Sequence, residues 1–379
     1  MLGTLICGTC FSAILMASCV NTTFQEEPVT GNVEREEPMI KFKAFSYIDA
    51  QGTGGEAFRF LMPSDWKFEG GITWILDLPA MPATAAFKVY NPNGAEAFEA
   101  FSNRCFFWTD NQFTLGLNPP GSRYFGMEVR PPLSAVDALQ QIVLWPARGN
   151  RRNLQVISAD ALPELARAVG AGKMGEGYVQ SFGDGARLRI TYEEGGVQME
   201  EEIYGVVEGM YFPIQSMYGT TTNIIWYMDY LFSFKARQGE LKNNASIFQT
   251  ITSSFRLNPQ WYARYSNMIE YLAQQQIQRI HSIGELSRML SQMSDQMRSE
   301  NLAQFEARGK AFDQGAQNFS DYMLNIDRYY DPFEEREVEL PSGYNHAWVN
   351  NLGEYILSDD PNFNPNVGSN LHWENMKRN

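Results

Sequence analysis

Between residues 39 and 115, apolar and polar residues alternate along the chain with a period of two. Gly, Pro and Asn interrupt the alternation, a combination typical of short β-strands joined by tight turns. The pattern predicts strands at 41–47, 57–60, 72–76, 86–90, 97–101 and 105–108. It also predicts a turn at Gly70-Gly71 and a hairpin turn, rather than a phosphate-binding loop, at Gly52–Gly55.

A helical period replaces this alternation at 131–146, where Leu133, Val136, Leu139, Ile142 and Val143 recur every few residues. Further helices are predicted at 162–169 and 240–255. Strand patterns lie at 154–158, 177–182, 186–193, 197–207, 210–217 and 223–234, with turns predicted at 183–185 and 194–196. Short strands with a few helices between them predict an α+β domain over 39–257, an antiparallel sheet with flanking helices.

This region resembles the PsbP/Mog1-like domains. An extended segment ends in Pro63-x-x-Trp66, strand hairpins follow, and a last helix ends at Phe255. The resemblance covers 39–257, implies an α-β-α sandwich common in exported bacterial lipoproteins, and requires insertions within 110–175. The family has no shared catalytic constellation, so the resemblance implies no site residue.

Residues 258–328 are predicted to be helical. Asn258 is a residue type favoured as an N-terminal helix cap, and Pro259 is one favoured in the first helical turn. A later apolar stripe has the alternating three- and four-residue spacing of a long helical hairpin or coiled coil (Ile283, Leu286, Leu290, Met293 and Met297). Its two methionines suit either core packing or an adaptable binding face. Ser282 and Glu285 have capping-box spacing, which favours a hairpin that folds back over pairing with a second chain.

The last region, 329–379, is acidic and aromatic. A β-hairpin is predicted from 345–349 and 354–358, with Trp348, Tyr355 and Trp373 forming one aromatic cluster. The loop that follows offers the hard oxygen ligands that calcium prefers, although its spacing differs from an EF-hand and a plain surface loop explains it as well (Asp359, Asp360, Asn362 and Asn364).

The first nineteen residues resemble the signal of a bacterial lipoprotein. An apolar run from Leu5 to Val20 is too short to span a bilayer and contains small residues directly before Cys19. The resemblance implies that 1–18 is a cleaved signal peptide and that Cys19 carries a diacylglyceryl group. Residues 19–38 are polar, acidic and Pro-containing, which predicts a flexible linker. An ordinary secretory signal or a buried N-terminal helix, with Cys19 incidental, is the alternative.

The composition of the chain limits the classes of partner that it can bind. The chain has 379 residues and a formal net charge of −14, which argues against nucleic-acid binding and against electrostatic attachment to anionic lipid. A membrane link would therefore be the covalent one at Cys19. Of the four cysteines, Cys105 alone lies beyond the signal region, so no disulfide is expected within the exported chain. Its neighbours Phe106, Phe107 and Trp108 predict a buried, inert thiol.

Candidate catalytic chemistry is sparse. The exported sequence contains no Gly-x-Ser-x-Gly, His-Glu-x-x-His, Cys-x-x-Cys or Walker-type motif, and no cofactor is expected. Glu200 and Glu202 share one face of a predicted strand, opposite to Glu201. They suit acid–base work, but a solvated strand face is the simpler interpretation. The sequence therefore predicts a non-enzymatic envelope protein that binds a small ligand or another envelope protein. The alternative is an envelope hydrolase with an active site assembled from scattered residues.

Overall fold

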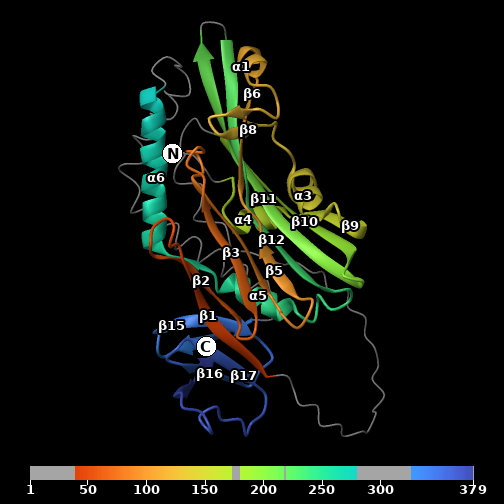
Figure 1. Cartoon of the computed structure of the whole chain (residues 1–379), viewed down its shortest axis with the longest axis vertical. Helices are drawn as coiled ribbons and strands as arrows, with labels where there is room; N and C mark the ends of the chain where they lie inside the picture. Colours follow the sequence, from red (N-terminus) through yellow and green to blue (C-terminus); the bar gives the residue numbers. More distant parts are fainter. Residues whose placement is uncertain (1–38, 173–179, 217–218, 280–325, 379) are drawn as a thin grey trace.

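The largest element is a ten-stranded, mostly antiparallel sheet in a computed structural model that describes residues 39–172, 180–216, 219–279 and 326–378 (Figure 1). Its main path runs in the order β3 (Lys67–Trp74), β4 (Ala83–Tyr90), β5 (Ala97–Ala100), β12 (Gly219–Arg237), β11 (Val197–Ser216), β10 (Gln180–Glu194) and β9 (Arg152–Ala161). Off this path lie β6 (Arg104–Thr109), which pairs with β12, and then β7 (Arg123–Tyr124) and β8 (Met127–Val129). The α+β class predicted from the sequence is confirmed.

Helices lie on both faces of this sheet. One face carries the continuous helical run of α2 (Ala135–Ala138), the π-helix η1 (Leu139–Leu144) and α3 (Trp145–Arg148). The other face is covered by β2 (Glu56–Pro63), α4 (Pro163–Ala168), α5 (Ala245–Ser253) and the start of α6 (Pro259–Arg279). The short helix α1 (Gln112–Leu117) follows β6 and has no buried residue. No helix among the described residues is long and apolar enough to cross a membrane.

The run α2–η1–α3 confirms the helix predicted over 131–146. Ser134 caps it, because its hydroxyl oxygen accepts from the backbone N–H of Asp137 at 3.1 Å. Pro146 has no N–H to offer the carbonyl of Ile142, so the backbone widens into π geometry just before it. The buried side of the run consists of Ala135, Ala138, Leu139, Val143 and Leu144.

The C-terminal region joins the first strands of the chain. A six-stranded sheet has the order β13 (Arg256–Leu257), β2, β1 (Ile40–Ile48), β17 (Glu354–Ser358), β16 (His346–Asn350) and β18 (Trp373–Asn375). The hairpin predicted in this region is confirmed, and its strand β17 pairs directly with β1. Beside it, β14 (Ile326–Asp331) pairs with β15 (Arg336–Pro341) and β19 (Lys377–Arg378).

The predicted aromatic cluster of this region is wrong in part. Tyr355 lies opposite Val349, whereas Trp348 lies opposite Ile356. Because neighbouring strand residues point to opposite faces, Trp348 and Trp373 share one face and Tyr355 lies on the other.

Two turns predicted from glycine lie instead inside strands, because β10 runs unbroken through 183–185 and β3 through 70–71. The strands predicted separately at 197–207 and 210–217 form the single strand β11. At these glycines other groups of the protein lie so close to the backbone that a side chain would collide with them. A Cβ at Gly185 would come within 2.5 Å of the Leu162 carbonyl oxygen, and one at Gly71 within 2.1 Å of the Tyr47 hydroxyl. These glycines are needed for close approach rather than for turning.

The predicted helical segment is described only at its two ends. α6 begins where expected, and the Asn258 side chain accepts from the backbone N–H of Gln260 at 2.9 Å. The hairpin or coiled coil predicted around Ser282, Glu285 and Met293 lies outside the described residues. β14 begins at Ile326, so the last three residues of the range predicted to be helical, 326–328, form a strand.

Candidate functional site

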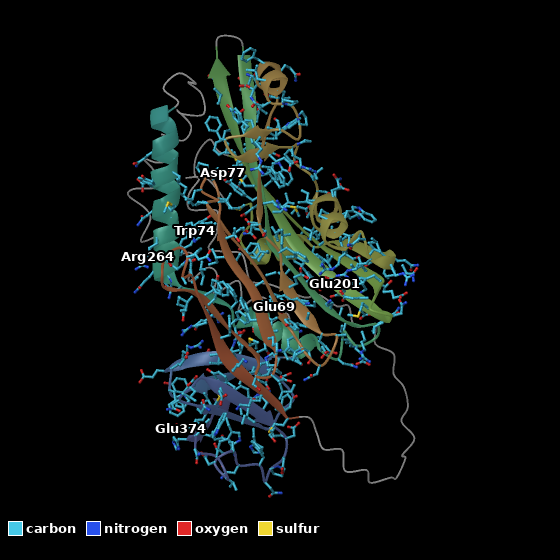
Figure 2. The ribbon with its side chains drawn as sticks, viewed as in Figure 1. Glu69, Trp74, Asp77, Glu201, Arg264 and Glu374 are labelled. Carbon is cyan, nitrogen blue, oxygen red and sulfur yellow. The ribbon has the colours of Figure 1, made fainter. Side chains whose placement is uncertain are left out.

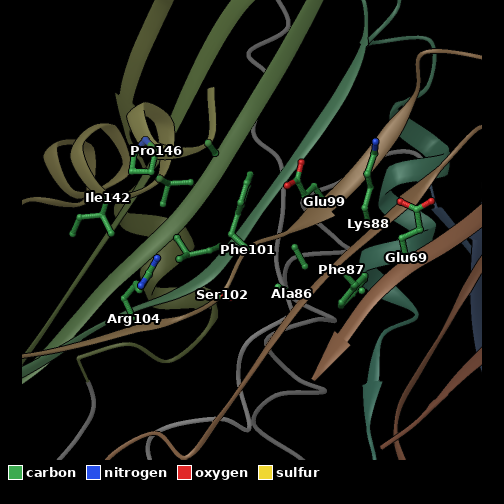
Figure 3. A pocket seen from close by; sticks show the side chains of 15 residues that line it. Glu69, Ala86, Phe87, Lys88, Glu99, Phe101, Ser102, Arg104, Ile142 and Pro146 are labelled. Atoms are coloured by element: carbon green, nitrogen blue, oxygen red, sulfur yellow. The ribbon is translucent and has the colours of Figure 1, made fainter. Parts of the chain in front are cut away.

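A groove of about 510 Å³ lies where the helical layer stops short of the edge of the long sheet (Figure 3). Its wall is the apolar side of η1 and α3, from Ile142, Val143 and Pro146. Its floor is the uncovered face of β3, β4 and β5, where small residues such as Gly70 and Ala86 leave room. We call this site the groove.

The groove lies at a fork in the sheet. β12 pairs with β5 near one end and with β6 further along, and the chain crosses from β5 to β6 in three residues. β4 pairs with β5 only over Phe87–Tyr90 and continues beside β3 alone. The separating strands open a hollow that the helix η1 borders on one side.

Three charged side chains form a row across the groove floor. Glu69 on β3 lies directly opposite Lys88 on β4, and Lys88 lies directly opposite Glu99 on β5. In antiparallel sheets such opposite residues share one face. Figure 3 shows these three side chains projecting in the same direction, with Arg104 at the other end of the groove.

Both carboxylates of this row are held by the protein itself. Glu69 Oε1 accepts from the Tyr90 hydroxyl at 2.5 Å. Glu99 Oε2 lies 2.5 Å from Nη2 of Arg148, the last residue of α3. The helical wall is thereby tied to the floor by an ion pair.

Beside the floor, on the same face of the sheet, Arg148 also binds Glu201 of β11. Arg148 Nε and Nη2 each donate to a Glu201 carboxylate oxygen at 2.8 Å, and the Tyr192 hydroxyl donates to Glu201 Oε2 at 2.9 Å. Burial alone would lower the pKa of the Arg148 guanidinium, but the charges of Glu201 and Glu99 outweigh it and raise that pKa above its usual value. This is a bidentate, buried ion pair, a geometry that strongly fixes orientation (Figure 2 marks Glu201 among the long strands).

The two cations that line the groove are not paired in this way. Among the described residues, no carboxylate oxygen lies within 4.0 Å of Lys88 Nζ or of the Arg104 guanidinium nitrogens. Burial lowers the pKa of Lys88, and nearby Lys235 lowers it further, against the opposing effect of Glu99, Glu194 and Glu69. The Lys88 ammonium is therefore incompletely compensated by its surroundings.

The predicted solvated face of Glu200 and Glu202 is wrong at Glu202, whereas Glu200 is half-buried. Glu201 is 0% and Glu202 3% exposed. On the face opposite to Arg148, Glu202 forms ion pairs with Arg187 and Arg189 and accepts from the Tyr204 hydroxyl at 2.5 Å. The adjacent glutamates thus belong to two separate buried networks, one on each side of the sheet.

Cys105 is buried, as the aromatic residues beside it predicted. It lies on β6 opposite Tyr227, on the face that packs against β2 and α5. Burial raises the pKa of its thiol well above the usual value, although the Tyr227 hydroxyl and the Phe106 backbone oppose this effect. The thiol does not line the groove, and neither described histidine, His346 or His372, does so.

The candidate calcium ligands have local hydrogen bonds. Asp359 accepts from the N–H of Asn345, fourteen positions earlier, at 2.7 Å, and Asp360 accepts from the Asn362 N–H at 2.8 Å, as in an Asx turn. The Asn364 side-chain oxygen accepts from the Asn366 N–H at 3.0 Å. Within the described ranges, no group of three or more His, Cys, Asp or Glu is placed to hold a metal ion. Calcium binding there stays a prediction, and the lipidation candidate Cys19 lies outside the described residues.

Sequence reasoning missed the groove. The predicted strands at 86–90 and 97–101 contain Lys88 and Glu99, which was a usable signal, whereas Glu69 lay outside the strand predicted at 72–76. Which strands pair, and where β12 exchanges β5 for β6, depends on residues more than a hundred positions apart.

A scan against protein-family models found no match, and a search of curated proteins found no relative. Among solved structures, one match is LpqN of Mycobacterium tuberculosis, described as involved in cell envelope biogenesis. It is 12% identical, with a TM-score of 0.23 over 57% of this chain and 92% of that chain. At this TM-score the two chains are not shown to share a fold, and we draw no functional argument from the likeness.

Proposed function

We propose that this chain is a lipid-anchored protein of a bacterial cell envelope that binds an extracytoplasmic ligand in the groove without transforming it. The apolar segment that closes on Cys19, followed by a polar linker, supports the location. The groove supports the binding role, because it combines a hollow of about 510 Å³, an apolar wall and convergent polar groups. The PsbP/Mog1-like resemblance of 39–257 fits the same location but assigns no ligand.

One observation carries the choice of binding over hydrolysis. Hydrolysis by carboxylates needs a group that is free to donate or accept a proton at the substrate. In the groove, Glu99 is bound by Arg148 and Glu69 by Tyr90. These contacts suit fixed side chains that shape a binding surface.

In-cell photocrosslinking tests the binding role. A benzophenone amino acid replaces Ile142 on the groove wall, and the matched control replaces Leu352, an exposed residue in the turn between β16 and β17. We expect an ultraviolet-dependent adduct from position 142 and none from 352. Absence of any adduct at 142 would contradict the binding role. A hydrolytic activity of the purified protein that Glu99→Gln abolishes would favour the hydrolase alternative.

A separate experiment tests the anchor. Cys19→Ser should move the protein from the detergent phase to the aqueous phase in Triton X-114 partitioning and abolish metabolic labelling with palmitate, because no acyl chain is then attached. Cys10→Ser is the matched control and should change neither result. Unchanged palmitate labelling of Cys19→Ser would contradict lipidation at this residue.

A further inference from the structure

The hairpin of β11 and β12 projects beyond its neighbouring strands. β10 pairs with β11 only as far as Tyr211, and β6 pairs with β12 only as far as Asn223. Among the described residues beyond these points, the two strands pair only with each other, from Phe212 opposite Asn223 to Ser216 opposite Gly219. A narrow two-stranded ribbon therefore forms this end of the molecule (Figure 1).

The short helix α1 is fixed beside the base of this ribbon. The backbone N–H of Asp110 donates to the Thr222 carbonyl oxygen at 3.2 Å, and Asp110 Oδ1 accepts from the Thr222 N–H at 2.8 Å. Asn111 caps α1, because its side-chain oxygen accepts from two backbone N–H groups of the first turn at 3.0 and 3.1 Å. We call the ribbon together with residues 111–122 the tip.

Two large apolar side chains project from the tip into solvent. Phe113 is 77% and Leu117 67% exposed, and their four-residue spacing places them on the same side of α1. Phe113 is the most exposed aromatic side chain among the described residues. Leu115 packs against the core and holds the helix in place. The helix therefore presents an apolar pair outward at fixed positions.

The tip is uncharged in an acidic chain. Neither 111–122 nor 211–224 contains a charged residue, although 20% of the residues of the chain are charged and its formal net charge is −14. The polar side chains of these two segments are those of Asn, Gln, Ser, Thr and Tyr, which hydrogen-bond without carrying charge at neutral pH. The tip can therefore approach a bilayer without electrostatic repulsion and without the cost of desolvating an ion.

The shape of the tip fits a lipid surface better than a protein surface. A stable protein interface buries about 800 Å² on each partner, across a broad complementary face. The tip is only a two-stranded ribbon and one short helix, and its apolar pair stands out from it. A bilayer needs no complementary pocket, because apolar side chains can enter the boundary between its head groups and acyl chains to a depth of about 5–10 Å.

We infer that Phe113 and Leu117 insert into a lipid bilayer and make the tip a second, non-covalent membrane contact. The inference does not depend on the groove, and it uses the proposed anchor at Cys19 only for proximity. When extended, the predicted linker 19–38 is as long as the 20-residue strand β11, about 66 Å at roughly 3.3 Å per residue, so the chain can lie along the bilayer that holds its N-terminus. Tethering raises the effective concentration of lipid at the tip, so that two apolar side chains suffice.

The test places a fluorescent reporter on the tip of the full chain. Dansylalanine replaces Gly116, which is exposed between the two apolar residues and has no atom within 4 Å of an added Cβ. In the matched control, dansylalanine replaces Val367, which is 80% exposed in the C-terminal region. The chains are reconstituted in phosphatidylcholine vesicles with and without spin-labelled phosphatidylcholine, a quencher that is confined to the lipid.

We expect quenching at position 116 and none at 367. Phe113→Ser with Leu117→Ser should lower the ratio of inserted to free tip by about tenfold or more, which corresponds to about 1.4 kcal/mol, because less apolar surface then leaves water. Leu352→Ser with Val367→Ser removes two exposed apolar side chains elsewhere and should leave the quenching at 116 unchanged. Melting curves establish that the variants fold equally. Quenching should be the same at about 0.1 M and about 1 M salt, because no charge takes part.

Each contrary result has a separate meaning. Chains that are recovered with the vesicles but show no more quenching at 116 than at 367 would overturn the inference and leave the anchor standing. Quenching that survives Phe113→Ser with Leu117→Ser, or that is lost in high salt, would overturn insertion of the apolar pair. A blue-shifted emission without quenching would mean that protein covers the tip instead. Chains that stay out of the vesicle fraction in every variant would remove the anchor along with the inference, while the adduct at position 142 still tests the groove.

Discussion

The two faces of the long sheet are closed by different means. On the face that meets β2 and α5, aromatic rings pack on one another, with Phe58 and Phe87 centroids 5.2 Å apart and Phe234 and Phe248 centroids 4.8 Å apart. On the other face, the short run α2–η1–α3 covers β10 and β11, and beyond it the charged row of the groove begins.

The difference concerns what each kind of contact requires. Apolar packing depends on the volume and shape of the side chains, so different aromatic rings of similar size can fill the aromatic face. A buried charge needs a particular partner at a particular place, as Glu201 needs Arg148. The groove lies on the face where Arg148 pairs with Glu201, because Arg148 ends the helical layer at a fixed point beside Glu99 of β5.

The largest expected effect tests this dependence. Arg148→Leu leaves the 0% exposed Glu201 carboxylate without its cation, and should lower the free energy of unfolding by about 3–5 kcal/mol. Urea unfolding measures it. Arg189→Leu is the control on the aromatic side, where Glu202 keeps Arg187 and Tyr204, and should cost about 1 kcal/mol or less.

A double variant sharpens the same comparison. Arg148→Leu with Glu201→Leu removes both charges and should recover most of the lost stability, because no unpaired ion remains. Equal losses in Arg148→Leu and Arg189→Leu would contradict the special dependence of the groove face on its ion pair.

Alkaline pH should destabilise both faces. Burial raises the pKa of Tyr192 on the groove side and of Tyr204 and Tyr227 on the aromatic side, with Glu201, Glu202 and Cys105 respectively adding to the effect. The folded protein keeps these protons, while the unfolded chain loses them near pH 10. The stabilisation is therefore complete below pH 10 and falls above it by about 1.4 kcal/mol per tyrosine per pH unit.

At pH 11 the three tyrosines together should cost about 4 kcal/mol, against a smaller opposite contribution from the lowered pKa of Lys88. Urea unfolding at pH 8, 9, 10 and 11 measures the slope. Tyr192→Phe and Tyr204→Phe should each remove about 1.4 kcal/mol of the loss at pH 11, to which the raised pKa values of Tyr355 and Cys105 also contribute. A stability that stays level to pH 11 would show that the hydroxyls are not held in this way.

Local patterns predicted the elements well and their environments poorly. The hairpin of β16 and β17 and the Asn258 cap were predicted because each depends on residues a few positions apart. The glycines at 183 and 185 indicate a turn or a close approach equally well, and the deciding neighbours belong to α4 and its flanking loops.

The burial of Glu201 and Glu202 could not be predicted in this way. Three consecutive glutamates have the composition of a solvated strand face, and Arg148 lies 53 positions from Glu201. The groove poses the same problem more severely, since it requires the register of β3, β4, β5 and β12 together.

The third expected effect concerns how α6 is held on the aromatic side. Asp49 is 1% exposed and accepts from the indole N–H of Trp261 at 2.8 Å and of Trp74 at 3.2 Å, as well as from two backbone N–H groups in its loop. Figure 2 marks Trp74 beside α6. Asp49→Ala leaves these donors unpaired and should cost about 2–3 kcal/mol in urea unfolding followed by tryptophan emission.

Asp77→Ala, at an exposed position, is the matched control and should change stability by less than about 0.5 kcal/mol. Asp49→Asn keeps one side-chain acceptor and should fall between the two. If Asp49→Ala is as stable as Asp77→Ala, the two tryptophans must find other acceptors, and α6 is held by its apolar side alone.

The smallest expected effect is at Cys105, which contributes to the aromatic face only by packing. Its thiol is 5% exposed, and burial raises its pKa well above the usual value, so little thiolate forms at neutral pH. It should react slowly with DTNB in the folded protein and promptly in denaturant. Cys105→Ala should cost about 1 kcal/mol and leave the adduct at position 142 unchanged, because the thiol does not line the groove. Fast labelling of the folded protein would mean that the aromatic face opens readily, and the contrast between a closed face and an open one would then fail.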